Sequence, residues 1–268
     1  MGSELDILVI DDEQVVLDAV EHICSAEGLQ VKTAQDGPSA LQALDQHRFR
    51  LVLCDIMMPE VDGFQVLSEV QRRFPQTPVI MSTGFSTVEN AVKSLSAGAI
   101  DFVPKPFTAD ELLSTITRGL RYRGLLKTTG GRSVASDDSR GFTVPCPARY
   151  SRLGYMSWTV MESDGSALIG VSHAFARTIE GISSIETVAE QEEIVQGIQC
   201  AQIHTTAELT HSVLSPLSGK IIERNLRLEK DPHIVEKDPY FAGWLYRIIP
   251  SDPDYELSQL TPCGSDAV

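Results

Sequence analysis

Five side chains of this sequence have the types and the spacing of a phosphoryl-transfer site. Asp11 and Asp12 directly follow one short apolar run, and Asp55 directly follows another. Like charges a few ångströms apart repel, so three such carboxylates need a cation, and oxygen ligands without His or Cys favour Mg²⁺. Thr83 and Lys105 follow two later apolar runs. Together they predict chemistry in which a carboxylate attacks phosphorus while the metal and the lysine neutralise the transferring oxygens.

The segments around these side chains predict the elements that position them. Apolar runs alternate with helical patterns along this part of the chain. The apolar runs lie at 5–10, 29–33, 51–54, 78–81 and 100–103. The helical patterns lie near 15–24, 38–47, 64–74, 87–97 and 108–124. Five buried strands alternating with helices predict an α/β fold with a doubly wound parallel sheet. Ligands of such sheets bind beyond the carboxyl ends of the strands, where the five side chains would converge. For any one aspartate alone, a helix N-cap is the alternative.

Two neighbours of this site have local interpretations. Prolines flank Lys105 and restrict its backbone, so the Lys105–Pro106 bond is a candidate cis peptide. Cys54 precedes Asp55, but adjacent residues of a strand point to opposite faces, so we expect Cys54 in the core.

The motifs LDILVIDDE, LVLCDIMMPEVDGF, VIMSTGF and DFVPKPF lie in this order within residues 4–124. Their order and spacing resemble the receiver domain of bacterial two-component response regulators. The resemblance implies a flavodoxin-like receiver over residues 1–124. It also implies that Asp55 accepts a phosphoryl group from the phosphohistidine of a sensor kinase or a phosphotransfer protein.

The same resemblance implies roles for the other residues of the site. Mg²⁺ would be held by Asp11, Asp12, Asp55 and the backbone carbonyl of Met57. Thr83 and Lys105 would bind the phosphoryl group. Phe102 would change rotamer when Thr83 moves, with a plain core phenylalanine as the alternative.

Charge and cysteine content exclude several classes of function. The chain has 22 basic and 37 acidic residues, a net charge of −15, which is unlike a protein that binds nucleic acid or an anionic membrane. It has no apolar run of membrane-spanning length and no secretory pattern, so we expect a cytoplasmic protein. Its five cysteines are an odd number without a CxxC motif. This predicts free thiols in a reducing compartment rather than disulfides or a zinc site.

Beyond residue 124 the pattern changes. Residues 125–148 are rich in small and polar side chains and predict a flexible linker. Short alternating runs follow at 157–161, 167–171, 200–205, 220–223 and 244–249, separated by turn residues, and predict a mainly β domain over 149–268. We expect Trp158, Trp244 and Tyr246 in its core and His233 on its surface.

The stretches SALIGVSHAFARTIEG, SPLSGKIIERN and KDPHIVEKDPYFAGWLYRIIPSDP resemble the glycine-cleavage H protein, a lipoyl carrier, over about 149–252. The resemblance implies a lipoyl-type β-sandwich with a hairpin that displays the carrier lysine. Counting back from Ser215, the lysine position falls on Glu208, and no lysine lies between Arg177 and Lys220. Lipoate forms an amide with an amine, so we expect no lipoylation, because Lys220 lies beyond the hairpin.

The hairpin leaves three interpretations open. His204, Glu208 and His211 could form a metal site, the tip could dock a protein, or it could be a solvated turn. Motifs for nucleotide hydrolysis, DNA binding and cyclic-dinucleotide turnover are absent, so we expect no enzymatic output beyond receiver self-phosphorylation and autodephosphorylation.

The leading hypothesis is a phosphorylation switch whose H-like, non-lipoylated domain binds an unidentified protein or a second copy of the chain as a homodimer. The alternative is a phosphate sink or relay protein with a passive dimerisation tail. A genuine lipoyl carrier under phosphorylation control is disfavoured by Glu208.

Overall fold

The computed structural model describes residues 4–84, 87–129 and 144–263. The chain divides into two compact units, one formed by residues 1–86 with 99–142 and the other by residues 87–98 with 143–268. None of the helices in the described ranges is long and apolar enough to cross a membrane.

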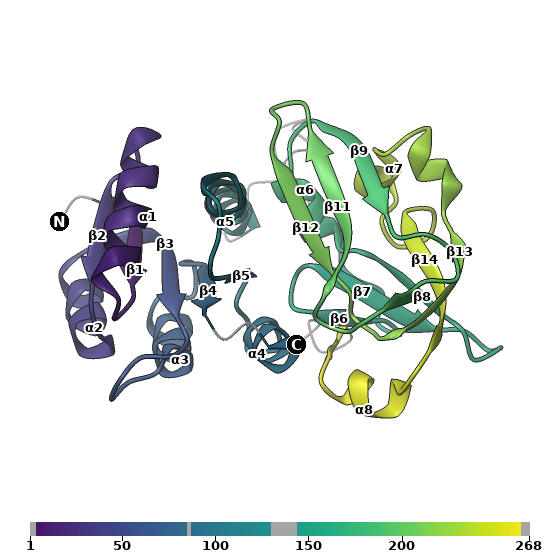
Figure 1. The fold of residues 1–268 in the computed structure, drawn as a ribbon, viewed down its shortest axis with the longest axis horizontal. Coiled ribbons are helices and arrows are strands. Elements are labelled where there is room, and N and C mark those ends of the chain that lie inside the picture. Colours follow the sequence, from purple (N-terminus) through teal and green to yellow (C-terminus); the bar gives the residue numbers. More distant parts are fainter. Residues whose placement is uncertain (1–3, 85–86, 130–143, 264–268) are drawn as a thin grey trace. The chain divides into compact units, whose positions relative to one another are not determined.

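The first unit is built on a five-stranded parallel sheet with the order β2-β1-β3-β4-β5 (Figure 1). Its strands are β1 (Glu4–Ile10), β2 (Val31–Ala34), β3 (Arg48–Asp55), β4 (Val79–Thr83) and β5 (Asp101–Pro104). The helices along this part of the chain are α1 (Gln14–Ala26), α2 (Gly37–Gln46), α3 (Gly63–Arg73), α4 (Val88–Ser96) and α5 (Ala109–Thr129). This topology confirms the predicted doubly wound, flavodoxin-like class.

Both faces of this sheet are buried, because alternate side chains of a strand point to opposite sides. In β1, Leu8 and Ile10 pack in one apolar cluster with α2 and α3, whereas Ile7 and Val9 pack in another with α1 and α5. Cys54 is fully buried in the first cluster, as predicted. The sheet is therefore a rigid platform whose strand ends are fixed from both sides.

The second unit contains a seven-stranded antiparallel sheet, β10-β13-β14-β8-β7-β6-β15, and a three-stranded sheet, β12-β11-β9. Its strands are β6 (Ser151–Leu153), β7 (Ser157–Met161), β8 (Ala167–Val171), β9 (Ile182–Thr187), β10 (Glu193–Ile194), β11 (Gln199–Thr205), β12 (Thr210–Leu214), β13 (Gly219–Arg224), β14 (Trp244–Pro250) and β15 (Thr261–Pro262). Short helices α6 (His173–Thr178), α7 (Ile234–Lys237) and α8 (Pro253–Ser258) and the 3₁₀ turn η2 (Leu226–Glu229) complete it.

The two sheets share one core, as expected of a sandwich. Ile203 and Val213 from the smaller sheet and Ile169 and Ile248 from the larger one belong to the same apolar cluster. The mainly β class is confirmed. Strand β9 was not predicted, because its buried Ile182 and Ile185 are three residues apart and break the alternation that marks a strand.

A second cluster in this unit is aromatic. Trp158 is fully buried beside the rings of Tyr150 and Tyr240, and its indole N–H donates to the Val171 carbonyl oxygen at 2.9 Å. Tyr246 is also fully buried, and Trp244 is half-buried against the aromatic cluster. The core positions predicted for Trp158, Trp244 and Tyr246 are confirmed.

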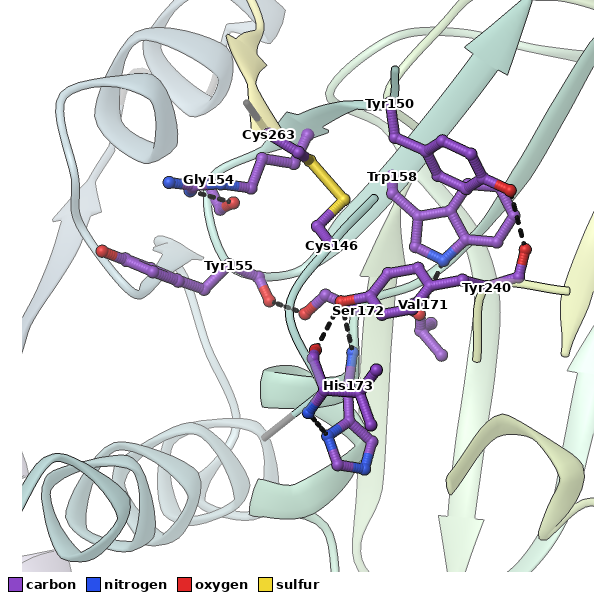
Figure 2. Close-up of a disulfide and its surroundings, with 12 residues drawn as sticks. Cys146, Tyr150, Gly154, Tyr155, Trp158, Val171, Ser172, His173, Tyr240 and Cys263 are labelled. Carbon is purple, nitrogen blue, oxygen red and sulfur yellow. Dashed lines mark hydrogen bonds between the residues drawn. A yellow bond between two sulfur atoms is a disulfide. The ribbon is translucent and has the colours of Figure 1, made fainter. Parts of the chain in front are cut away.

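The prediction of free thiols is wrong for two of the five cysteines. Cys146 and Cys263 form a disulfide with a Cα–Cα distance of 5.6 Å across a sequence separation of 117 residues (Figure 2). Cys24, Cys54 and Cys200 are buried free thiols. Spacing along the sequence could not reveal the pair, because only the closed fold brings the two ends of the second unit together.

The structure describes residues at both ends of the predicted linker, 125–148. Helix α5 continues to Thr129, residues 130–143 lie outside the described part, and residues 144–147 are attached to the second unit. We call residues 144–147 the strap. The Val144 N–H donates to Nδ1 of His173 at 2.7 Å, and the Tyr240 hydroxyl donates to the Val144 carbonyl oxygen at 3.4 Å.

Protonation of His173 is expected to loosen the strap. Its Nδ1 can accept from Val144 only while that nitrogen is unprotonated, and burial, reinforced by Arg177 and opposed by Glu236, lowers the His173 pKa below 6.5. As pH falls below about 6.5, His173 is therefore protonated in the unfolded chain before it is protonated in the folded one. The second unit loses stability over this range, until the pH drops below the pKa of His173 in the folded state.

His173→Asn keeps an acceptor oxygen but does not titrate. The free energy of unfolding of wild type and variant is measured by urea unfolding at about pH 7.5 and about pH 5.5. We expect it to fall at the lower pH in both proteins, but by less in the variant. Each unit by which folding lowers the His173 pKa is worth about 1.4 kcal/mol. Equal losses in both proteins would contradict this assignment.

Candidate functional site

The carboxyl ends of four strands bring the predicted site residues to one edge of the parallel sheet. Asp11 follows β1, Asp55 ends β3, Thr83 ends β4 and Lys105 follows β5. The strand register aligns these ends, since Asp55 is paired with Ser82 in the sheet. The convergence predicted from the sequence is therefore present for these four residues.

Lys105 links the two buried carboxylates of the site. Its Nζ lies 2.6 Å from Oδ2 of Asp11 and 2.9 Å from Oδ1 of Asp55. Asp11 and Asp55 are only 2% and 3% exposed, so neither charge is screened well by water. The Lys105–Pro106 peptide is cis, as predicted. The Lys105 N–H donates to the Thr83 carbonyl oxygen at 2.9 Å, which fixes the backbone that carries the ammonium group.

Electrostatics in the site follow from burial. Burial raises the pKa of Asp55 above its usual value, although the hydrogen bond and charge of Lys105 oppose it. The same competition raises the pKa of Asp11. Burial disfavours the charged form of Lys105, but its contacts with the two carboxylates outweigh this and raise its pKa. Two carboxylates thus share one ammonium, and the site keeps a negative balance.

A tight loop after β3 holds the Asp55 carboxylate in place. The Met57 N–H donates to Oδ2 of Asp55 at 2.9 Å, so that oxygen is oriented by backbone. Farther along, the Gly63 N–H donates to the Ile56 carbonyl oxygen at 3.0 Å as α3 begins. The Met57 side chain itself is 56% exposed. The loop therefore positions the carboxylate through main-chain groups.

Gly63→Ala is expected to disturb this loop. A Cβ at Gly63 would lie 2.1 Å from the Asp55 carbonyl oxygen and 2.9 Å from Cα of Ile56, and backbone atoms cannot yield as a flexible side chain does. We expect a loss of about 1–3 kcal/mol in the free energy of unfolding of the first unit. Denaturant unfolding followed by far-UV circular dichroism measures it.

Gly124→Ala is the matched control. Gly124 lies exposed on α5, and a Cβ there would meet no heavy atom within 4 Å. This change should stabilise the helix by about 0.5–1 kcal/mol. A Gly63→Ala protein as stable as wild type would show that the loop adapts without cost.

Thr83 and Phe102 lie in the adjacent strands β4 and β5. Thr83 is fully buried at the end of β4. Phe102, in β5, is half-buried against the apolar cluster of α2 and α3. Its N–H donates to the Asp101 carboxylate at 2.9 Å, and Asp101 forms a buried ion pair with Arg118 of α5. The backbone under Phe102 is thus anchored to α5, while its role as a switch stays a prediction.

The donor set suits Mg²⁺ in its chemistry. Asp11 and Asp55 supply hard carboxylate oxygens in a site with negative balance, and Asp12, the next residue after Asp11 in the chain, is exposed. Within the described residues, however, no group of three or more His, Cys, Asp or Glu side chains is arranged to hold a metal ion. Lys105, not a third carboxylate, contacts both buried aspartates.

Glu13 also lies at the site, although it was not predicted there. Oε1 of Glu13 lies 3.7 Å from Nζ of Lys105, although its side chain is 61% exposed. The signal was present, since Glu13 directly follows Asp11 and Asp12 in the run of three acidic residues.

Two family matches account for the two parts of the chain. Residues 7–117 match the response regulator receiver domain, and residues 149–263 match the glycine cleavage H-protein. The chain is a receiver domain joined to a glycine cleavage H-protein domain.

Curated relatives and a solved structure match part of the chain. Transcriptional regulatory protein ZraR of Klebsiella oxytoca is 33% identical over 168 residues, which are 63% of this chain and 37% of that protein. Probable transcriptional regulatory protein TcrX of Mycobacterium tuberculosis is 36% identical over 135 residues, which are 50% of this chain and 55% of that protein. The solved receiver domain of NtrX from Brucella abortus is 42% identical and covers 43% of this chain and 98% of its own, with a TM-score of 0.42. The chain thus spans about a third to a half of the length of these two curated relatives.

In the H-protein domain, Glu208 lies at the tip of the hairpin formed by β11 and β12. Its side chain is exposed, and its backbone has a φ of 62°, in the left-handed region. The Glu208 N–H donates to the Thr205 carbonyl oxygen at 3.1 Å and closes the turn. The position that the resemblance assigned to a carrier lysine is therefore a displayed carboxylate.

The structure contradicts a metal site formed by His204, Glu208 and His211. His204 pairs across the hairpin with Thr210, and Ile203 pairs with His211. Neighbouring residues of a strand point to opposite faces, so the two histidines do as well. His211 is 1% exposed, whereas His204 lies 3.0 Å from the Thr210 hydroxyl and 3.4 Å from Glu186 on the outer face. The alternation of the strand could have excluded this site from the sequence.

Proposed function

We propose that the chain is a response regulator of a two-component phosphorelay in which Asp55 accepts a phosphoryl group. The donor is the phosphohistidine of a sensor kinase or of a phosphotransfer protein. One observation carries the proposal, the Lys105 ammonium between the buried carboxylates of Asp55 and Asp11. A carboxylate can act as a nucleophile toward phosphorus, and its product is an acyl phosphate. A cation fixed beside the carboxylate then compensates the negative charge of that phosphate.

Each residue of the site has a separate role in the phosphoryl transfer. Asp55 attacks phosphorus, its Oδ2 oriented by the Met57 N–H, while the nitrogen–phosphorus bond of the donor breaks. Lys105 compensates the charge on the transferred oxygens, and the Thr83 hydroxyl donates to one of them. Asp11, Asp12 and Asp55 with the Met57 carbonyl would hold Mg²⁺, which supplies a Lewis acid to the phosphoryl oxygens.

Removal of Mg²⁺ tests the proposal. The full chain is incubated with phosphoramidate, a small donor with the nitrogen–phosphorus bond of phosphohistidine, and the modified peptide is identified by mass spectrometry. We expect phosphorylation on Asp55 with Mg²⁺ and a rate roughly 100-fold or more lower with a chelator, because a metal contributes several kcal/mol. Calcium-saturated chelator serves as the control. Equal rates with and without the chelator would contradict a role for the metal, and modification at another residue would contradict the whole assignment.

Output through a protein partner of the H-protein domain is the second half of the proposal. It is supported by the displayed carboxylate at Glu208, which cannot form the amide of a lipoyl carrier. Beryllofluoride with Mg²⁺ mimics the phosphoryl group on Asp55, so a bait in that state is compared with an Asp55→Ala bait. A partner captured only by the first supports a switch. Identical captures favour the phosphate sink, with a passive dimerisation tail.

A further inference from the structure

We propose that Cys146 and Cys263 are a thiol–disulfide exchange site, at which a small thiol of the glutathione class opens the bond and releases the strap. The site lies at the two ends of the H-protein domain, far along the chain from Asp55, and the expectation that its bond is reversible rests on the proposed function of the chain. Figure 2 shows the bond beside Tyr150, Trp158 and Tyr240.

The non-covalent attachments at both ends are few. On the strap, Val144 has the contacts with His173 and Tyr240 described above. At the other end, β15 has only two residues and pairs with β6, and the Cys263 N–H donates to the Tyr150 carbonyl oxygen at 2.9 Å. These three hydrogen bonds and the two-residue ladder stabilise such ends weakly. The covalent bond therefore decides whether the ends stay attached.

This pair is chemically distinct from the other cysteines. Cys24, Cys54 and Cys200 are buried free thiols, and burial raises the pKa of Cys24 to about 11 and that of Cys200 to about 12. The thiolate is the nucleophile, and thiols with so high a pKa are almost entirely protonated, so they react slowly. Within the disulfide, Cys146 is half-buried whereas Cys263 is 3% exposed. An incoming thiolate consequently reaches the sulfur of Cys146 first.

The proposed function of the chain predicts that the Cys146–Cys263 bond is reversible. Disulfides are rare in reducing compartments, and those that occur there are usually transient or redox-sensing. A response regulator that takes phosphoryl groups from a kinase works beside that reducing pool. A disulfide in its output domain is then expected to exchange with the pool.

The exchange runs in two balanced steps. A glutathione thiolate attacks Sγ of Cys146, the sulfur–sulfur bond breaks, and Cys263 leaves as a thiolate that takes up a proton. A second glutathione thiolate attacks the mixed disulfide and releases the Cys146 thiol. In sum, one protein disulfide and two glutathione thiols give two protein thiols and one glutathione disulfide.

The test equilibrates the full chain in buffers that range from fully oxidised to fully reduced glutathione. Alkylation and mass spectrometry measure the oxidised fraction of the pair, and hydrogen–deuterium exchange measures protection of peptides covering 144–150 and 260–263. We expect the disulfide to be formed in oxidised glutathione and open in reduced glutathione. Exchange of both peptides should rise roughly tenfold or more along the same curve, as for ends that detach locally.

Cys146→Ser provides the variant arm, and Cys24→Ala is the matched control. Cys146→Ser should show the high exchange of the reduced protein in every buffer, whereas Cys24→Ala should titrate like wild type. A bond that yields to glutathione only after denaturation would be a permanent cross-link and would overturn the proposal. So would thiols that stay free in oxidised glutathione, or peptides whose exchange is the same in both states.

Discussion

Asp55→Asn is expected to abolish phosphorylation of the chain. An amide cannot attack phosphorus to give an acyl phosphate, and the neutral side chain also removes one of the two carboxylates that hold the Lys105 ammonium. We expect incorporation from phosphoramidate with Mg²⁺ to fall by more than about 100-fold, to the background of the method. Intact-mass spectrometry of the full chain measures it directly.

Asp110→Asn is the matched control for this change. Asp110 is an exposed carboxylate in the first turn of α5, so its loss removes the same charge without touching the site. This variant should be phosphorylated at the wild-type rate. Residual phosphorylation of Asp55→Asn at Asp11 or Asp12 would mean that the site tolerates another nucleophile, and it would overturn the unique role of Asp55.

Glu208→Lys is expected to convert the H-protein domain into a substrate for lipoylation. The hairpin tip already displays position 208 to solvent, and what it lacks is an amine to form the amide with lipoate. Wild type incubated with lipoate, ATP and a lipoate–protein ligase should gain no lipoyl group. The variant should gain one on most molecules, which intact-mass spectrometry resolves.

Glu192→Lys tests whether presentation by the hairpin matters. Glu192 is also exposed, but it precedes β10 and lies outside the hairpin, so its lysine should not be modified. Lipoylation of wild type would show that a native lysine such as Lys220 is used, contrary to our assignment. Failure of Glu208→Lys with a folded domain would show that the tip no longer has the shape that a ligase recognises.

The receiver domain was largely predictable because its signals are local and mutually consistent. Each buried strand is a short apolar run, and Asp11 and Asp55 follow such runs directly, whereas Thr83 and Lys105 follow one residue later. A parallel sheet converts that order along the chain into proximity in space. The sequence could not show that Lys105 contacts both Asp11 and Asp55, because this depends on side-chain conformations at the strand ends.

The H-protein domain was less predictable, for physical reasons that differ between its parts. Strands β7 and β8 are short runs between turn residues and were predicted with their observed bounds, whereas the buried residues of β9 are three positions apart. The disulfide joins residues 117 positions apart, and such a pair leaves no trace in the spacing of cysteines. The hairpin histidines were wrongly placed together, because strand alternation was not applied to His204 and His211.

The bond between Cys146 and Cys263 also sets the mechanical behaviour of the H-protein domain. Tension applied across the two ends of the domain passes from the strap through the sulfur atoms to residue 263, so the strands between them carry none of the load. In the oxidised state a partner could pull on one end without extending the domain. In the reduced state the same pull would act on the ladder between β15 and β6, which peels one hydrogen bond at a time. The oxidation state would thus select between a rigid tether and an extensible one.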